Sequence, residues 1–218
     1  MKIQGIIVAS FLILFAALSA QAQTAFTNLN FEQARPNPDT PGSVTAVSAL
    51  PHWTASIDGV QQTEVEYDEI SGGAASVALV SAAIPYYPAI DGNYSVLLQA
   101  YPPGSVVSIS QTDLIPAGSQ SLLFEANRDT AAFELFVGTQ IVPFSAVGSG
   151  PNYTLYGANI SAWADDTEEI AFTVLGGSPN NNWELDDISF SAVPEPSIMG
   201  LSAIAGLLFS ARKWFARR

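Results

Sequence analysis

Short apolar segments, separated at even spacing by turn signals, fill the middle of this 218-residue chain. They cover residues 76–80, 94–99, 106–110, 121–126, 133–137, 170–175 and 183–191, with turns such as Pro102-Pro103-Gly104 and Gly176-Gly177 between them. In residues 133–137 and 170–174 every second side chain is apolar, as expected for a strand with one buried face. The pattern predicts an all-β domain, namely a jelly-roll-like β-sandwich.

The beginning of the chain has the layout of a secretory signal peptide. Lys2 is followed by an apolar run over residues 6–18 and by the small-residue site Ala20-Gln21-Ala22. Residues 1–22 are therefore predicted to form a signal helix that is cleaved on export. The remaining residues 23–192 are enough for one domain with a buried core. The chain has no cysteine, so this core cannot depend on disulfides.

The predicted domain is strongly acidic. It keeps two bases, Arg35 and Arg128, against 19 of the 20 acids, which gives it a net charge of −17. Such a surface repels nucleic acid and anionic lipid and attracts cations. Nucleic acid is therefore excluded as a partner.

The last 26 residues divide into three parts. They are a proline-rich signal (Val193, Pro194, Glu195, Pro196, Ser197), an apolar run over residues 198–209, and a basic end with Arg212, Lys213, Arg217 and Arg218. Pro196 keeps the residue before it out of the helical region, so the signal is extended and open to a processing enzyme. The uncharged run of about 15 residues is short for a bilayer, but Trp214 can extend it as an interfacial anchor while the basic end stays in the cytoplasm. We expect residues 193–218 to include a transmembrane helix.

These three parts, in this order at the chain end, resemble the PEP-CTERM sorting signal. The resemblance implies an exported bacterial protein of the cell envelope, outer surface or extracellular matrix. It also implies an exosortase-type transpeptidase as partner, which releases the protein from its membrane anchor. The alternative is a plain C-terminal membrane anchor.

The two ends of the domain carry a second resemblance. The domain opens with the motif NLNFE (residues 28–32) and closes with LDDISF (residues 185–190). The two motifs are similar to those of galactose-binding-like jelly rolls, the group that holds many carbohydrate-binding modules. In those folds the first and last strands are neighbours and hold a structural calcium ion, which implies Glu32 and Asp187 as Ca²⁺ ligands and Asp186 as a further candidate. The alternative is that these acids are solvated turn and edge residues.

Strict alternation along the closing segment cannot bury all of its apolar residues. If Trp183 faces the core, Asp187 faces it too, and if Ile188 faces the core, Asp186 does. Either a β-bulge at Asp186-Asp187 shifts the alternation, or an acid points inward and needs a partner.

Catalysis is not predicted. His52 is the only histidine and is interpreted as a turn residue, so a Ser-His or Cys-His catalytic set would rest on it alone. The acid pairs Asp165-Asp166 and Glu168-Glu169 could serve glycoside hydrolysis, but they belong to a polar turn, which favours a solvated face. We predict a non-enzymatic surface or matrix protein. A structural matrix component without a ligand stays open, as does, less favoured, a glycan hydrolase.

Three tyrosines are the predicted polysaccharide-binding residues, because sugars stack their apolar C–H faces on exposed aromatic rings. Tyr86 and Tyr87 stand between Pro85 and Pro88, which favours a loop that displays both rings. Tyr101 precedes a proline pair in the same way. The expected partner is an exopolysaccharide. The alternative is that the rings cap the ends of the core.

The tail leads to a testable prediction. Protein recovered from the native cell surface should have lost its tail by processing near residues 194–197, because the signal is extended and the membrane span is marginal. Intact-mass measurement checks this. A mass that still includes Arg218 would reduce the tail to an ordinary anchor.

Overall fold

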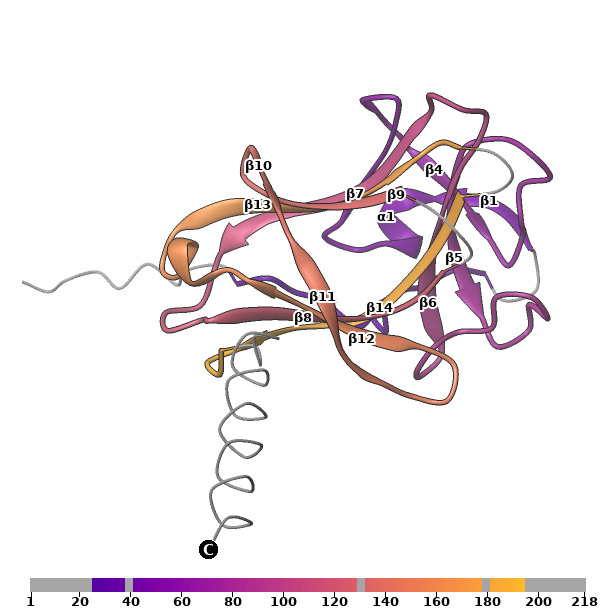
Figure 1. The fold of residues 1–218 in the computed structure, drawn as a ribbon. Coiled ribbons are helices and arrows are strands. Elements are labelled where there is room, and N and C mark those ends of the chain that lie inside the picture. The colour runs from indigo at the N-terminus through magenta and orange to yellow at the C-terminus, as the bar shows by residue number, and fades with distance from the viewer. Residues whose placement is uncertain (1–24, 38–40, 129–131, 178–180, 195–218) are drawn as a thin grey trace, which may run out of the picture.

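The computed structural model describes residues 25–37, 41–128, 132–177 and 181–194, which form a sandwich of two β-sheets (Figure 1). In spatial order the larger sheet holds β1 (Gly42–Thr45), β4 (Glu64–Tyr67), β5 (Ser76–Ser81), β6 (Tyr94–Ala100), β14 (Asn181–Ser191), β8 (Ser121–Arg128), β12 (Thr154–Asn159) and β11 (Phe144–Ser149). The smaller sheet holds β10 (Gln140–Val142), β9 (Ala132–Val137), β13 (Thr167–Leu175), β7 (Val106–Leu114), β2 (Thr54–Ile57) and β3 (Val60–Gln61). The predicted all-β sandwich is confirmed.

All seven segments predicted as strands form strands, namely β5, β6, β7, β8, β9, β13 and β14. The strands that the sequence pattern did not indicate, β1 to β4 and β10 to β12, have two to six residues each. Two short helical turns, α1 (Ala46–Ala49) and η1 (Ser161–Trp163), complete the described elements.

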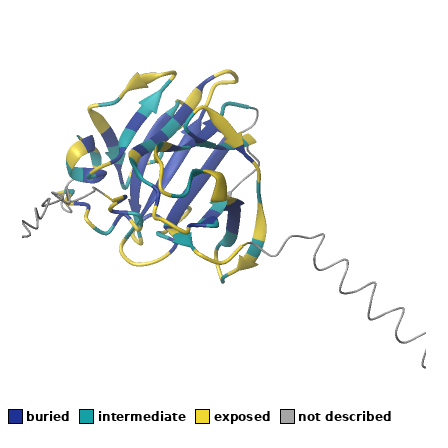
Figure 2. Ribbon diagram, turned by 90° about the vertical axis from the view of Figure 1, so that its left-hand side faces the viewer, coloured by how far each residue is buried: buried dark blue, intermediate teal, exposed yellow. Residues whose placement is uncertain are grey.

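The chain crosses repeatedly from one sheet to the other. It does so eight times between the described strands: from β1 to β2, β3 to β4, β6 to β7, β7 to β8, β8 to β9, β10 to β11, β12 to β13 and β13 to β14. This winding is of the jelly-roll type. It encloses one core between the sheets, and Figure 2 shows the buried strands inside a shell of exposed loops and edges.

Aromatic rings join the two sheets across this core. Trp183 of β14 stacks on Phe133 of β9, with ring centroids 4.0 Å apart and planes at 12°. Phe124 of β8 meets the edge of Phe172 of β13 at 5.2 Å. Offset and edge-on pairs of this kind add about 0.5–1.5 kcal/mol each beyond the burial of their area.

β14 contains the predicted β-bulge. Its register with β8 shifts directly after Asp186, and Asp187 has a positive φ of 43°. The extra residue lets Trp183, before the bulge, and Ile188, after it, both belong to the main core. Of the two alternatives, the shifted alternation is therefore correct, and Asp186 lies on the outer face of the sheet.

Residues 82–93, between β5 and β6, fold back over that outer face. There a second, smaller apolar cluster consists of Ala78, Val80, Ile84 and Leu97, bordered by Ile70 and Tyr87. Because Ile84 and Ile90 of this loop are buried, the loop is packed onto the sheet.

Both ends of the described domain lie at the same end of the sandwich. Ala25 bridges Leu114, the last residue of β7, and the ring of Phe26 lies 5.2 Å from that of Phe190 near the end of β14. The predicted signal helix (1–22) lies outside the described residues, and so does the predicted tail (193–218) from residue 195 on. In the part of the chain that the structure describes, no helix is long and apolar enough to cross a membrane.

Candidate functional site

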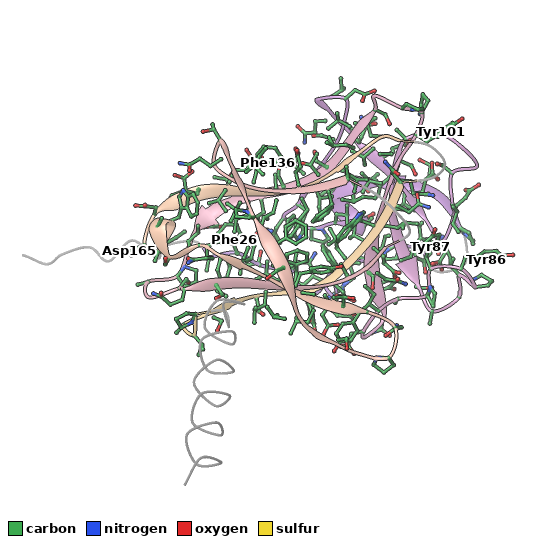
Figure 3. All side chains as sticks on the ribbon, viewed as in Figure 1. Phe26, Tyr86, Tyr87, Tyr101, Phe136 and Asp165 are labelled. Atoms are coloured by element: carbon green, nitrogen blue, oxygen red, sulfur yellow. The ribbon has the colours of Figure 1, made fainter. Side chains whose placement is uncertain are left out.

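The three tyrosines predicted from the sequence line one hollow, at the end of the sandwich where β14 begins. Tyr86 and Tyr87 come from the loop 82–93, and Tyr101 directly follows β6 (Figure 3). The hollow has a volume of about 420 Å³, and its other lining residues are Ile70, Ser71, Gly72, Gly73, Ala74, Gln99 and Asn182. The structure therefore brings the predicted tyrosines together.

The three rings are presented to different degrees. Tyr86 is 81% exposed and Tyr101 is 38% exposed, whereas Tyr87 is half-buried against the smaller apolar cluster. In Figure 3 Tyr86 projects outward from its loop. Tyr87 thus packs against apolar residues, as the alternative had it, whereas the ring of Tyr86 faces solvent.

Hydrogen-bonded amides form the floor of the hollow. Asn182 Nδ2 donates to the Tyr87 hydroxyl at 2.8 Å, and Gln99 Nε2 donates to Asn182 Oδ1 at 3.5 Å. Gln99 Oε1 accepts from the Ser71 backbone N–H at 3.0 Å and from the Ser76 hydroxyl at 3.2 Å. Because Gln99 and Asn182 are buried, these bonds fix the floor and the Tyr87 ring before a ligand arrives.

Two aspartates hold the ends of the loop that carries the tyrosine pair. Asp68 accepts bonds of 2.7 Å from both the backbone N–H and the hydroxyl of Ser81. Near the other end, Asp186 Oδ2 accepts from the Ser95 hydroxyl at 2.8 Å and from the Asp91 N–H at 3.1 Å. These bonds therefore anchor the loop 82–93 near both of its ends.

The sequence alone did not point to Gln99, Asn182 or Asp68. Asn182 meets Tyr87 from 95 residues away, and Gln99 meets Ser71 from 28 residues away. The one local signal is that Gln99 is a polar residue in an otherwise apolar strand end, two positions before Tyr101.

The opening and closing segments are neighbours, as the family resemblance implied. The Ile188 N–H donates to the Leu29 carbonyl at 3.0 Å. The Glu32 carboxylate, however, points to the turn before β6. There it accepts hydrogen bonds from the backbone N–H groups of Asn93 (2.6 Å) and Tyr94 (3.0 Å) and from the Asn93 side-chain amide (2.7 Å).

The predicted calcium ligands do not complete a metal site as placed. Asp186 already accepts hydrogen bonds from the Asp91 N–H and the Ser95 hydroxyl. Burial, and after it the negative charges of Asp91 and Glu32, raise the pKa of Asp187. Among the described residues, no three or more histidine, cysteine, aspartate or glutamate side chains are arranged to hold a metal ion. Calcium binding stays a proposal that needs these side chains to turn toward a shared ion.

Glu184 and Asp186 are buried on the outer face of β14, at 0% and 1% exposure. Neither carboxyl oxygen of Glu184 has a hydrogen-bond partner within the described residues. Burial, and after it the neighbouring Asp186, raise the pKa of Glu184 to about 8. Burial raises the pKa of Asp186 to about 7, against the lowering effect of its hydrogen bonds. Glu184 is therefore mainly protonated at neutral pH.

The remaining sequence candidates lie away from the tyrosine hollow. His52 is exposed on a turn with φ of 72°, as predicted. Asp165 and Asp166 are exposed on a turn at the opposite end of the sandwich (Figure 3), and Glu168-Glu169 belong to β13. The acid pairs and the tyrosines thus form no common site.

Comparison with known proteins finds solved structures that are similar to this chain at low sequence identity. No protein-family model matches the sequence, and no curated protein matches it. Among solved structures, TmCBM61 in complex with β-1,4-galactotriose is 16% identical, covers 76% of this chain and 96% of its own, and has a TM-score of 0.43. A family 11 carbohydrate-binding module from Clostridium thermocellum, in complex with a β-1,3-1,4-mixed-linked tetrasaccharide, is 9% identical over 71% and 97%, with a TM-score of 0.35. A cyclase from Fischerella sp. TAU is 12% identical over 80% and 99%, with a TM-score of 0.48. At these values no conclusion about ligand or reaction is carried over.

The buried carboxyls predict that the domain loses stability as pH rises. The folded state holds the Glu184 proton up to a pKa of about 8, against an ordinary value of 4.5, so it binds more protons than the unfolded state between these values. The free energy of unfolding should fall through this window. Urea unfolding between pH 5 and pH 9 measures it, and Glu184→Gln should reduce the fall by about 2 kcal/mol.

The control for this experiment is Asp165→Asn, which removes an exposed carboxyl from a turn with φ of 72° that asparagine also tolerates. It should leave the pH profile unchanged. An equal fall in wild type and Glu184→Gln would contradict the protonated state of the buried carboxyl.

Calcium gives a second prediction. It should raise the melting temperature of the full-length chain by several degrees, because a hard cation relieves the repulsion among Asp187, Asp91 and Glu32. Asp187→Ala should remove most of the gain. An equal response in wild type and in the Glu32→Ala, Asp187→Ala double variant would mean that calcium only screens the acidic surface.

Proposed function

We propose that this chain is an exported surface or extracellular-matrix protein that binds polysaccharide and catalyses no reaction. The observation that carries the proposal is the hollow in which Tyr86, Tyr87 and Tyr101 meet Gln99 and Asn182. These features suit a sugar. The C–H faces of a sugar can stack on the outward ring and on the second ring at the wall, and its hydroxyls can form hydrogen bonds with the amides of the floor.

The burial of two acids supports the non-enzymatic part of the proposal. Glu184 and Asp186 follow Asn182 along the same face of β14, but both are almost fully buried. A glycosidase needs two carboxyl groups that flank the scissile bond of its substrate. Carboxyls beneath a packed loop cannot reach a sugar in the hollow.

Export and sorting belong to the same proposal. The signal peptide would deliver the domain to the envelope, and the PEP-CTERM-like tail would anchor it in the membrane until an exosortase-type enzyme processes it. The placement of the hollow supports such a display. β14 leads from Asn182, which lines the hollow, to Ser191 just before the tail, and at about 3.3 Å per residue its ends are about 30 Å apart. A chain held by its tail would present the hollow away from the membrane.

The test uses the full-length chain in affinity electrophoresis, through gels that contain the exopolysaccharide of the producing organism. Wild type should be retarded. Tyr86→Ala should weaken binding about threefold to tenfold, because it removes the most accessible stacking ring. Since Tyr86 is 81% exposed, this substitution leaves packing almost unchanged.

Two controls sharpen the experiment. Tyr86→Phe keeps the ring and should keep most of the affinity. Phe136→Ala removes a half-buried ring from β9, at a distance from the hollow (Figure 3), and should not change mobility. Retardation that Tyr86→Ala leaves intact would move binding to another surface. Unchanged mobility of wild type in all gels would favour a structural matrix component without a ligand.

A further inference from the structure

We infer that the tyrosine hollow takes uncharged sugar residues and rejects glycans that carry carboxylate or sulfate groups. The inference rests on the proposed function and names the ligand class of the same site. Three observations lead to it, namely the chemistry of the lining, the state of its amides and the charges beside it.

Among the residues that the structure describes, no charged side chain lines the hollow. Its walls are made of three tyrosines, small residues and one isoleucine, and its polar side chains are hydroxyls and amides. A uronate or sulfate that enters must give up water, and this costs free energy unless a cation or several donors replace the lost hydrogen bonds. The described lining residues include no cation.

The amides of the floor already hold one another. Gln99 Nε2 donates to Asn182, Asn182 Nδ2 donates to the Tyr87 hydroxyl, and the Ser71 N–H donates to Gln99. Rotating Gln99 or Asn182 away from these partners would break bonds that position the Tyr87 ring, so the two amides cannot regroup as a cluster of donors around an anion. The arrangement therefore favours ring stacking over the capture of an anion.

Acids directly precede one lining residue of the hollow in the chain. The segment 64–69, which leads into the lining residue Ile70, contains Glu64, Glu66, Asp68 and Glu69 and no base. These acids interact with one another, since burial, followed by Glu69 and Glu64, raises the pKa of Glu66. An anionic glycan near this segment meets like charge, whereas a neutral one does not.

The experiment compares two forms of one polymer with the full-length chain. The first is a neutral polysaccharide that retards the wild type, and the second is the same polymer after oxidation of part of its primary alcohols to carboxylates. The oxidised form should bind at least about fivefold more weakly at low salt, and the difference should narrow in 0.5 M NaCl because salt screens the repulsion. Glu69→Gln should recover part of the lost affinity, and Asp165→Asn, at the far end of the sandwich, should recover none.

Each other result overturns a defined part of the argument. Equal or tighter binding of the oxidised polymer, or retardation by acidic polysaccharides only, would overturn the uncharged ligand class and leave glycan binding standing. A loss of affinity that salt and Glu69→Gln leave unchanged would also overturn it, because the loss would then come from a hydroxyl contact. Absence of retardation by every polysaccharide, neutral or acidic, would instead overturn the proposed function, and this inference with it.

Discussion

The β-bulge at Asp186-Asp187 is the constraint on which the rest of the structure depends. β14 lies inside the larger sheet, paired with β6 on one side and β8 on the other. A strand without the extra residue would place either Trp183 or Ile188 outside the core and would bring an acid into it. An unpaired carboxyl in an apolar core costs several kcal/mol. The bulge keeps the apolar residues on both sides of it on one face and leaves the acids on the other.

The outer face that results is what produces the hollow. Asn182, Glu184 and Asp186 alternate along β14, and polar groups on a covered face need partners. The loop 82–93 supplies them at both ends of this row, through Tyr87 at Asn182 and through the Asp91 N–H at Asp186. Glu184, between them, has no hydrogen-bond partner within the described residues, and burial favours its protonated form. The hydrogen bonds that pair the polar side chains of β14 therefore also position the loop 82–93, which carries Tyr86 and Tyr87.

The sequence predicted the parts of the fold in which local pattern decides the outcome. Alternating or continuous apolar residues located β5 to β9, β13 and β14, and prolines on both sides of Tyr86 and Tyr87 correctly indicated a loop. Among the strands that were missed, β3 consists of two exposed residues and carries no burial pattern. The partners of the site were missed because Asn182 and Tyr87 are 95 residues apart. For Glu32 the sequence indicated the neighbouring strand but not its bonds to Asn93, which is 61 residues away.

The proposed function also places a mechanical demand on β14. In a chain held by its tail, a pull from a glycan in the hollow would enter near Asn182 and leave beyond Ser191, so it would run along this one strand. β14 pairs with β6 over residues 181–185 and with β8 over residues 183–191. A force parallel to the strand loads these backbone hydrogen bonds together, whereas a force at a sheet edge would open them one after another. A central strand that leads from the hollow toward the tail is therefore a suitable element to transmit such a force.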